Sequence, residues 1–387
     1  MKYLLLILLL FISHFGLAQN QSEYTGFLEQ AVRAAKDNDA KNFEANLKYL
    51  SAALERDHVS PERLSAQNRE LYMEALLQAL SYRGFNISNE TAENALKFIR
   101  YDIENSPRQQ FALGRLYYFG KGVERDYKQA RYWYEKAAEK GNATAMTYLG
   151  YMYEYGQGVT QEYKQAKYWY EKAAEKGDVM AMNNLGVLYH NGQGVTQDYK
   201  QAKYWYEKVA EKGNATAMKN LGILYHYGQG VTQDYKQAKY WYEKAAEKGD
   251  ANAMKNLGDL YYYGQGVTQD YKQAKYWYEK AAEKGNATAM KNLGVLYHNG
   301  RGVTKDYKQA KYLYEKAAEK GDARAMNNLG VLYHYELGVT QDYKQAKYWY
   351  EKAAEKGDAN AMKNLGDLYY YGQGVTQDYK QAKYWYE

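Results

Sequence analysis

The chain contains no cysteine and only two prolines among its 387 residues. The lack of thiols excludes disulfide bonds, cysteine nucleophiles, iron–sulfur clusters and cysteine-ligated zinc. Proline is rare inside helices and common in loops and at sheet edges, so its scarcity favours helices with few interruptions. The first prediction is therefore an all-α protein.

A strong excess of charge of one sign is also missing. The formal net charge is +6, and the stretch Asp250–Gly285 carries five acidic and five basic residues. A nucleic-acid-binding protein would gather Lys and Arg in a patch, so we expect no nucleic-acid partner. With 46% apolar and 25% charged residues, the composition is not that of a polytopic membrane protein either.

Residues 1–18 have the pattern of a secretory signal peptide. Lys2 supplies a short positive region, Tyr3–Ile12 is apolar, and Gly16-Leu17-Ala18 offers a small-x-small cleavage site. We predict cleavage near Ala18 and an exported chain, periplasmic or secreted, that is not an integral membrane protein afterwards. An uncleaved anchor is the alternative, but the apolar run is shorter than the roughly 20 residues that span a bilayer.

From Ser106 onward the sequence repeats every 36 residues. The copies are residues 106–141, 142–177, 178–213, 214–249, 250–285, 286–321, 322–357 and the incomplete 358–387. A fixed period of this length is typical of a solenoid or an array, in which each unit packs only on its neighbours. We number positions within a repeat from the first residue of each copy.

Positions 2 to 14 of each copy predict a first helix, called helix A. In the copy from Asp250, residues Ala251, Met254, Leu257, Gly258 and Tyr261 share one helical face and are the expected core. An Asp, Asn or Ser at position 1 suits an N-cap, Ser106-Pro107 adds proline at the first helical position, and the glycine at position 15 suits a left-handed C-cap.

A second helix, called helix B, is predicted to follow Asp270, which stands with Gln273 in a spacing typical of a capping box. Its expected inner face holds Tyr271, Ala274, Trp277, Tyr278, Ala281 and Ala282. Lys284 and Gly285 close it. Each repeat is therefore predicted to be an αα-hairpin in which alanine and glycine permit close helix packing.

The pattern Ala-x-x-x-Leu-Gly-x-Leu-Tyr-x-x-Gly-x-Gly-Val-x-x-Asp-Tyr-x-x-Ala-x-x-Trp-Tyr-x-Lys-Ala-Ala-x-x-Gly, from Ala253 to Gly285, resembles the Sel-1-like repeat family, a relative of the tetratricopeptide repeat. The resemblance covers residues 106–387 and implies a right-handed α-solenoid that binds other proteins and is not usually an enzyme. Two copies depart from it: Glu336-Leu337 replaces Gly-Gln, and Leu313 replaces Trp. If position 15 needs positive φ, Glu336 costs on the order of 1 kcal/mol.

Residues 19–105 have a different sequence that is also periodic like helices. Its apolar groups fit four helices: Phe27, Ala31 and Val32; Phe43, Leu47, Leu50 and Leu54; Leu64, Leu71, Ala75, Leu76 and Leu80; Ala95, Phe98 and Ile99. Ser60-Pro61 has the same helix-start signal as Ser106-Pro107. We interpret this region as degenerate hairpins that cap the solenoid, with a separate ligand-binding domain as the alternative.

Residues suited to catalysis are scarce. No serine lies in the repeats beyond Ser106, and His58 is the only mature histidine before them, so a serine–histidine pair is not expected. Asp259 and Asp367 lie three repeats apart and cannot act on one bond. The histidines at position 13 lie one repeat or more apart, too distant to share a zinc ion, and are expected to be surface or groove-lining. We predict no catalytic residue, no cofactor and no metal; a hydrolase of cell-wall or β-lactam substrates, suggested for relatives of this family, is the least favoured function.

Helix A varies between copies at positions 3, 6, 7, 10, 13 and 14, which share one face. In helical-hairpin solenoids the first helix lines the concave surface, so this face predicts a groove that binds a protein or peptide. Drift at exposed positions is the alternative, but the exposed face of helix B hardly varies. The predicted partner-binding residues are Tyr151, Val187, His190, Ile223, His226, Tyr227, Asp259, Tyr262, Tyr263, His298, His334, Tyr335, Asp367, Tyr370 and Tyr371.

The face of helix B that repeats suggests a second hypothesis. Tyrosine recurs at position 27 with Lys four residues to either side, as with Lys272 and Lys280 around Tyr276. Such a ladder would bind acidic glycans or cell-wall polymers by multivalent cation–π contacts. The alternative is that the Lys stems simply cover Tyr rings on a solvated helix.

The last copy stops at Glu387 after 30 residues, and residues 358–387 repeat 250–279 without change. We expect one of three outcomes: the sequence is a fragment of a longer array, the last helix frays, or a partner or a second copy covers it. Self-association through this uncapped repeat is thus a further expectation. The homogeneous repeats and the short signal sequence suggest a bacterial protein.

Overall fold

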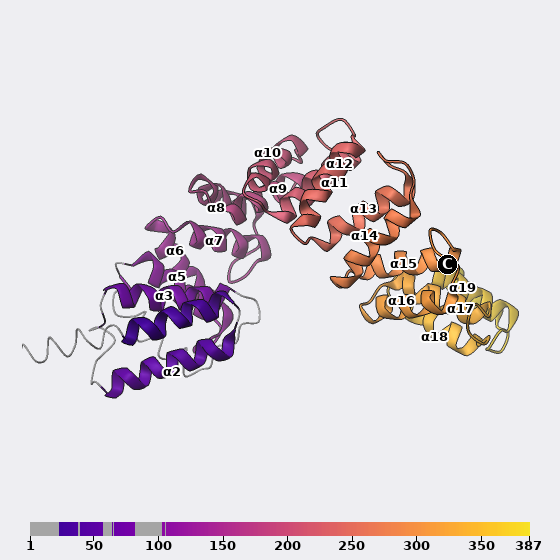
Figure 1. Ribbon diagram of the computed structural model, residues 1–387, viewed down its shortest axis with the longest axis horizontal. Helices are drawn as coiled ribbons and strands as arrows, with labels where there is room; N and C mark the ends of the chain where they lie inside the picture. Colours follow the sequence, from indigo (N-terminus) through magenta and orange to yellow (C-terminus); the bar gives the residue numbers. More distant parts are fainter. Residues whose placement is uncertain (1–22, 38, 57–63, 65, 82–102, 105) are drawn as a thin grey trace, which may run out of the picture. The chain divides into compact units, whose positions relative to one another are not determined.

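The computed structural model describes residues 23–37, 39–56, 64, 66–81, 103–104 and 106–387 (Figure 1). Throughout these residues the regular secondary structure is helical, without a strand. They fall into two compact units, Met1–Gln197 and Asp198–Glu387, each of which is described by itself. The all-α prediction is confirmed for the described residues, which form the paired helices of an α-solenoid.

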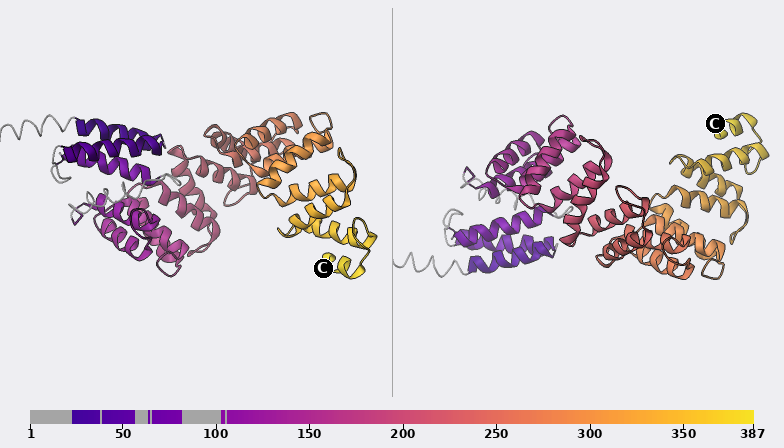
Figure 2. Two further views of the ribbon diagram at one scale, coloured as in Figure 1. Left: turned by 90° about the horizontal axis from the view of Figure 1, so that it is seen from below. Right: turned by 90° about the horizontal axis from the view of Figure 1, so that it is seen from above.

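In the first unit a helix over residues 23–36 precedes the labelled helices. These are α2 (Ala40–Arg56), α3 (Ala66–Ser81), α5 (Pro107–Phe119), α6 (Tyr127–Glu139), α7 (Ala143–Tyr155), α8 (Tyr163–Glu175) and α9 (Val179–Asn191). From α5 onward, consecutive helices pack in order as hairpins that lie side by side (Figures 1 and 2).

The second unit continues the same alternation of helices A and B. Its helices are α10 (Tyr199–Glu211), α11 (Ala215–Tyr227), α12 (Tyr235–Glu247), α13 (Ala251–Tyr263), α14 (Tyr271–Glu283), α15 (Ala287–Asn299), α16 (Tyr307–Glu319), α17 (Ala323–His334), α18 (Tyr343–Ala354), α19 (Ala359–Tyr371) and α20 (Tyr379–Tyr386). Within this unit, each helix from α11 to α19 packs most closely on the helix before it and the helix after it in the chain.

The predicted ends of helix A are confirmed. At α13, the Asp250 carboxylate accepts a hydrogen bond from the Ala253 amide at 2.8 Å, which satisfies one of the first-turn N–H groups. Gly264 caps the other end with φ of 69°, and its N–H donates to the Leu260 carbonyl. The sequence thus encodes both ends of helix A locally, except at α17, which ends at His334 with Tyr335 as the C-cap.

The start of helix B is only partly as predicted. At α14, Asp270 accepts from the amides of Lys272 and Gln273 at 2.8 and 3.1 Å. The Asp270 N–H, however, donates to the Tyr261 carbonyl at 2.9 Å instead of pairing with the Gln273 side chain. Only one half of the capping box is therefore formed. The Asp270 N–H, which the Gln273 side chain would have accepted, is already bonded to the end of helix A.

The core of a hairpin is built from small residues of helix A and one ring of helix B. Ala253, Leu257 and Leu260 are completely buried on α13, and Tyr278 of α14 is 1% exposed. A Cβ atom on Gly258 would lie 2.4 Å from that ring, so the glycine makes room for the tyrosine. Ala251 and Tyr261, both predicted as core, are instead partly exposed, because the buried face is rotated toward Ala253 and Leu260.

Trp277 was predicted on the inner face of helix B, and this is only partly right. The Trp277 side chain is half-buried, whereas its neighbour Tyr278 fills the core. Leu313, at the same position in the copy from Asn286, is buried. The shorter leucine stays within the hairpin, while the larger indole extends to the surface, where its ring packs edge-on against that of Tyr276.

The loop from helix A to helix B touches the preceding repeat. Gly266 has φ of 70°, and a Cβ atom there would lie 2.6 Å from Tyr235 at the start of α12. Glycine at position 17 is therefore required both by the backbone conformation and by the close approach. Glu336 at position 15 has φ of 58° and is, among the described residues, the only non-glycine with positive φ, as predicted for that position.

The described N-terminal helices share a core with the first repeat. Tyr24, Leu28, Phe43 and Leu50 are buried in one cluster with Leu113 and Leu116 of α5. The helices predicted around Phe27, Phe43 and Leu71 are present. The helix predicted around Ala95, Phe98 and Ile99, and the start at Ser60-Pro61, lie outside the described residues.

In the part of the chain that the structure describes, helices long and apolar enough to cross a bilayer are not found.

Candidate functional site

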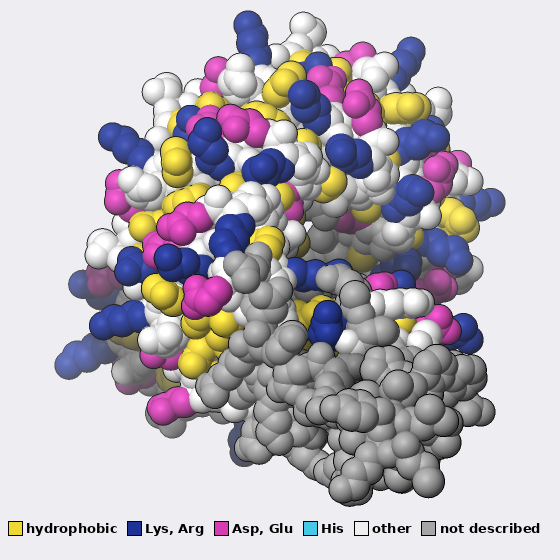
Figure 3. Space-filling view, turned by 90° about the vertical axis from the view of Figure 1, so that its left-hand side faces the viewer, with side chains coloured by type: hydrophobic (Ala, Val, Ile, Leu, Met, Phe, Trp, Pro, Cys, Tyr) yellow, Lys and Arg dark blue, Asp and Glu magenta, His cyan; other side chains and the backbone are white. Residues whose placement is uncertain are grey.

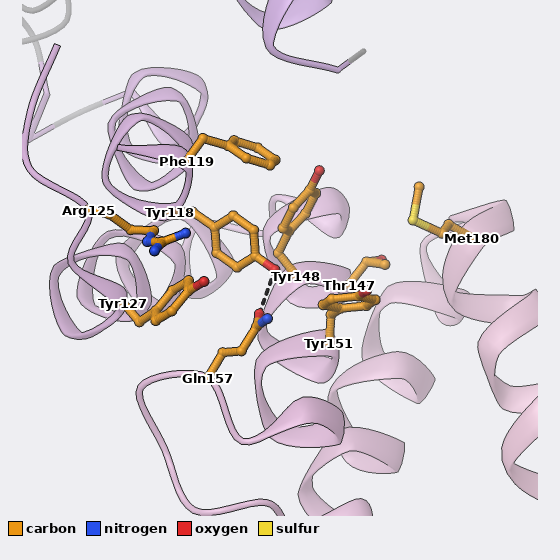
Figure 4. Close-up of a pocket in the computed structure, with 9 residues that line it drawn as sticks. All are labelled: Tyr118, Phe119, Arg125, Tyr127, Thr147, Tyr148, Tyr151, Gln157 and Met180. Carbon is orange, nitrogen blue, oxygen red and sulfur yellow. Dashed lines mark hydrogen bonds between the residues drawn. The ribbon is translucent and has the colours of Figure 1, made fainter. Parts of the chain in front are cut away.

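The variable positions of helix A converge on one pocket in the first unit (Figure 4). It has a volume of about 520 Å³ and is built from three successive repeats. Its lining residues are Tyr118, Phe119, Arg125, Tyr127, Thr147, Tyr148, Tyr151, Gln157 and Met180. Six of these nine stand at the helix A positions that vary between copies: 3, 6, 7, 10, 13 and 14.

Aromatic rings form the walls of this pocket. Tyr118 lies at its centre, with its ring centroid 5.3 Å from that of Tyr127 and 5.8 Å from that of Tyr148, both edge-on. The ring of Tyr151 packs on Tyr155 at 4.3 Å. These edge-on and tilted contacts favour a defined orientation of each ring, so packing shapes the walls of the pocket.

Three polar groups are placed among these rings. The Tyr118 hydroxyl donates to Gln157 Oε1 at 2.5 Å, the bond dashed in Figure 4. Burial raises the pKa of Tyr118 well above its usual range, so the hydroxyl stays protonated and remains a donor. The guanidinium of Arg125 lies 5.7 Å from the centroid of the Tyr127 ring. These groups offer a hydrogen-bonding edge and one cation among the rings; none is arranged as a nucleophile beside a base.

Of the residues predicted to bind a partner, the pocket contains Tyr151. The prediction did not name Tyr118, Arg125, Tyr148 or Met180, although the positions of three of them were recognised as variable. A signal was present in the sequence: position 7 is Asn in the six copies from Asp178 onward but is Tyr148 here, and position 20 is Gln in six copies but Arg125 here.

The other predicted residues lie along helix A in both units. Val187 and His190 are half-buried on α9, and Ile223 and His226 on α11. The tyrosines at position 14 are the most exposed of the set, between 61 and 65%: Tyr227, Tyr263, Tyr335 and Tyr371. They form a row of aromatic side chains spaced one or more repeats apart, within reach of solvent.

Asp259 has a structural role that the sequence did not predict. It accepts hydrogen bonds from Tyr278 Oη at 2.7 Å, Lys255 Nζ at 3.1 Å and Asn292 Nδ2 at 3.2 Å. Asn292 belongs to α15, so Asp259 links the helices A of two repeats. Asp367 similarly accepts from Tyr386 and Lys363. Both carboxylates are partly buried and engaged rather than freely solvated.

Tyr262 and its equivalent Tyr370 lie beside the C-terminal end of helix A. The guanidinium of Arg301, from the next repeat, donates to the Tyr262 hydroxyl and lies 5.5 Å from the ring centroids of both Tyr262 and Tyr271. Tyr370 is 44% exposed. This part of helix A therefore presents aromatic rings, and in one repeat a cation stacked on them.

The histidines at position 13 are less accessible than predicted. His334 is only 7% exposed, with Nδ1 3.4 Å from the Tyr350 hydroxyl, which corrects its expected place on the surface. His298 is half-buried, with its ring edge-on to Tyr307 at 5.2 Å. Desolvation lowers the pKa of His190, His226, His298 and His334, so these rings are neutral near pH 7.

The exposed face of helix B carries the repeated tyrosine–lysine pairs. Tyr276 is 48% exposed, with Lys280 Nζ 5.9 Å from its ring centroid; the contact recurs from Lys136 over Tyr132 to Lys352 over Tyr348. The lysine that follows the tyrosine makes the contact, whereas Lys272 was predicted to share it. Figure 3, which views the molecule from the left-hand side of Figure 1, shows basic, acidic and hydrophobic side chains interspersed over the coloured surface.

Within the described residues, no three His, Asp or Glu side chains are grouped so that they could hold a metal ion.

Comparison with known proteins identifies the family. The Sel1 repeat model matches residues 110–142, 143–178, 179–214, 215–250, 251–286, 287–322, 323–358 and 359–387. The chain therefore belongs to the Sel1 repeat family, whose members are generally protein-interaction scaffolds without catalytic activity.

Two solved structures are similar over large parts of the chain. The protein c5321, a protective antigen of uropathogenic Escherichia coli with an SLR fold, is 31% identical, with a TM-score of 0.64 over 95% of this chain and 78% of that one. A Sel1 repeat protein from Oxalobacter formigenes is 36% identical, with a TM-score of 0.59 over 65% of this chain and 100% of that one. No curated protein matches the sequence.

Proposed function

We propose that this chain is an exported, non-catalytic scaffold that binds a protein partner through the helix A faces of its repeats. The observation that carries the proposal is the pocket to which α5, α7 and α9 each contribute residues at variable positions. Family membership supports protein binding in general. That the partner binds on the helix A face is part of our proposal.

The chemistry of this face suits a protein interface. Aromatic side chains supply large contact area with little loss of conformational freedom and are enriched where binding energy concentrates. Exposed tyrosines at position 14 recur along helix A, whereas positions 6 and 10 beside them differ between copies. A repeated anchor with variable neighbours allows each repeat to contribute its own contacts.

A matched pair of variants tests the helix A face. In the first, Tyr151 of the pocket and the exposed Tyr227 and Tyr263 are replaced by Ala. In the second, Tyr240, Tyr276 and Tyr312 of helix B are replaced by Ala. With wild type and both variants as bait in envelope extract and host serum, we expect a partner that the wild type and the helix B variant retain and the helix A variant loses. Retention by the helix A variant would contradict the proposal, provided that circular dichroism shows all three proteins folded.

Export is tested separately. The proposal rests on the sequence of residues 1–18 and predicts that the chain in periplasmic or extracellular fractions begins at Gln19. N-terminal sequencing of the fractionated protein measures this. A cytoplasmic chain that retains residues 1–18 would refute export without touching the proposed binding face.

Glycan binding by helix B is the second candidate, because an exposed tyrosine with a lysine above it recurs at 36-residue intervals. It predicts that the helix B variant loses sedimentation with cell-wall polymer while the helix A variant keeps it. A hydrolase of cell-wall or β-lactam substrates remains the least favoured candidate, since the repeats lack serine beyond Ser106.

A further inference from the structure

The pocket, built from the first three repeats, differs from the corresponding place in later repeats. At position 7, the copies from Asp178 onward carry asparagine. Between several neighbouring repeats this side chain forms a hydrogen bond with the buried tyrosine of the preceding repeat, as Asn184 does with Tyr170 and Asn292 with Tyr278. The second copy carries Tyr148 instead. Its ring packs on Tyr134 with centroids 5.3 Å apart and cannot replace the lost amide bond.

This exchange leaves a polar group unsatisfied. Tyr134 is completely buried, and its hydroxyl has no hydrogen-bond partner in the described part of the chain. A buried hydroxyl without a partner costs stability. Tyr148 therefore removes a hydrogen bond that asparagine makes in later repeats, and its ring adds an aromatic wall to the pocket.

A second exchange adds charge at the same place. Position 20 is glutamine in most copies, and its Nε2 donates to the carbonyl at position 13, as Gln161 does to Glu154 at 2.8 Å. In the first copy this position is Arg125, whose guanidinium stacks on Tyr127 and lines the pocket (Figure 4). Arg125 is the only charged residue among the nine that line it.

The surrounding repeat is basic as well. Residues 106–141 contain four Arg, four Lys and four acidic residues, whereas residues 250–285 contain five basic and five acidic residues. Outside this first copy, arginine occurs within residues 106–387 only at Arg301 and Arg324. The pocket is thus an apolar, aromatic cavity with one cation, Arg125, in its lining. It belongs to a repeat of net charge +4, a value shared by residues 286–321, so acidic groups would be attracted to it.

We propose that this pocket binds an acidic peptide segment of the partner, with one aromatic or large aliphatic side chain inserted between Tyr118, Tyr148 and Tyr151 and a carboxylate on Arg125. The inference rests on the proposed function and deepens it by naming the site and the class of partner. The volume of about 520 Å³ admits one large side chain with part of its backbone. Met180, 56% exposed at the edge on α9, is a flexible apolar group that adapts to the inserted side chain.

A peptide is favoured over a glycan by the shape and composition of the site. The walls are rings that meet edge-on around a cavity, which suits an inserted side chain. Gln157 Oε1 is engaged by Tyr118, so the polar edge is limited to a few groups and does not offer the many paired donors and acceptors that a sugar ring requires.

The test uses the full chain and random peptides displayed on phage. We expect the selected peptides to share an aromatic or large aliphatic residue flanked by Asp or Glu. A synthetic copy should bind wild type and lose at least about tenfold in affinity, measured by calorimetry, on Tyr148→Asn and on Arg125→Gln. Both variants restore the residue that most other repeats carry, so they are expected to fold; thermal melting checks this.

Two controls locate the effect. Arg301→Gln removes one positive charge in the second unit and should leave the affinity unchanged, and peptides with Gln in place of the acidic residues should bind weakly. If the peptides bound the Tyr148→Asn and Arg125→Gln variants as tightly as wild type, the pocket would not be the peptide site. Protein binding by helix A would not be affected by that result. Selection of basic peptides, or of no peptide, would also overturn the proposed peptide site. If the chain instead bound an acidic-glycan array, and the helix A variant lost no protein partner, the proposed function would fail too.

Discussion

The glycine in the middle of each helix A is present because of a ring on helix B. A Cβ atom at Gly258 would lie 2.4 Å from the Tyr278 ring and at Gly222 2.5 Å from the Tyr242 ring, closer than real contacts allow. Glycine inside a helix ordinarily costs about 1 kcal/mol relative to alanine. The array accepts this cost because the buried tyrosine fills the space.

We therefore expect Gly258→Ala to destabilise the protein, opposite to the usual effect of this change in a helix. The ring must move or the helices must separate, and overpacking of this kind costs about 1 to 3 kcal/mol. Gly26→Ala is the matched control: Gly26 lies in the helix over residues 23–36 with nothing within 4 Å of the added Cβ, so stability should be unchanged or higher. Thermal denaturation measures both, and a higher melting temperature for Gly258→Ala would contradict the packing.

Glu336 is a second residue at which the backbone conformation determines how a substitution changes stability. Its φ of 58° matches the 65° to 69° of the glycines that occupy position 15 elsewhere. Glu336→Gly should stabilise the chain by about 1 kcal/mol, because glycine has no Cβ to strain in this conformation. The reciprocal change Gly372→Glu should destabilise by a similar amount. Equal melting temperatures for both variants and wild type would show that the conformation carries no strain.

At the scale of the element, helix B is held chiefly by its neighbours. Residues 271–279 and 379–387 have the same sequence, but α14 packs between α13 and α15, whereas α20 packs on α19. Tyr278 is 1% exposed and its counterpart Tyr386 is 48% exposed. Residue propensities are identical over these nine positions, but α14 continues to Glu283 whereas α20 ends at Tyr386. A difference in stability therefore comes from packing and from the shorter helix.

Hydrogen exchange of this chain should show the difference directly. We expect the amides of Lys383 to Tyr386 to exchange much faster than those of Lys275 to Tyr278, because fewer buried contacts oppose local opening of α20. Mass spectrometry of peptic fragments, on a sample shown to be monomeric, measures both segments. Equal protection would mean that stacking is not what stabilises helix B.

The ends of the elements could be predicted from sequence, because they depend on nearby residues. Asp250 and Gly264 cap α13 through bonds within four residues, and those positions repeat in nearly every copy. The assignment of Trp277 and Tyr278 was harder. Both are large, aromatic and adjacent, and only the position of Gly258 on the facing helix decides which ring enters the core.

The candidate site was only partly predictable for the same reason. The variable face of helix A was visible in the sequence, and Tyr151 lies in the pocket. Tyr118, Arg125 and Tyr148 come from two repeats and meet only in three dimensions. The hydrogen bonds of Asp259 across to Asn292 were likewise invisible, because a pattern of exposed positions does not show which polar groups pair.

At the scale of the whole molecule, the neutral histidines make stability depend on pH. Desolvation lowers the pKa of His190, His226 and His298 in the folded chain below the 6.5 of the exposed side chain. As the pH falls below about 6.5, the unfolded chain binds these protons first, so stability is present above that pH and is lost as the pH falls toward the folded pKa values. Asp259 and Lys255 near His226, and Lys305 near His298, modulate the shifts.

We expect the melting temperature to fall between about pH 7.5 and about pH 5, and to fall less when His190, His226 and His298 are replaced by Tyr. Tyrosine is the residue at position 13 in the copies from Asp250 and Asp358, so the replacement suits the repeat. Calorimetry at matched ionic strength measures the difference. An identical fall in both proteins would assign the pH dependence to carboxylates.

The two connections of each repeat differ in how much extra chain they tolerate. The loop that contains Gly266 is pressed against Tyr235, whereas an added Cβ at Gly177, Gly213 or Gly357 in the turn from helix B to helix A would meet nothing within 4 Å. A flexible insert between Gly177 and Asp178 gives up the hydrogen bond from the Asp178 N–H to Ala173 but separates no packed surfaces. The same insert after Gly158 would lift that loop from Tyr127. The array is thus a scaffold into which an epitope or a reporter can be spliced at the turns of Gly177, Gly213 and Gly357 while the adjoining hairpins stay closed.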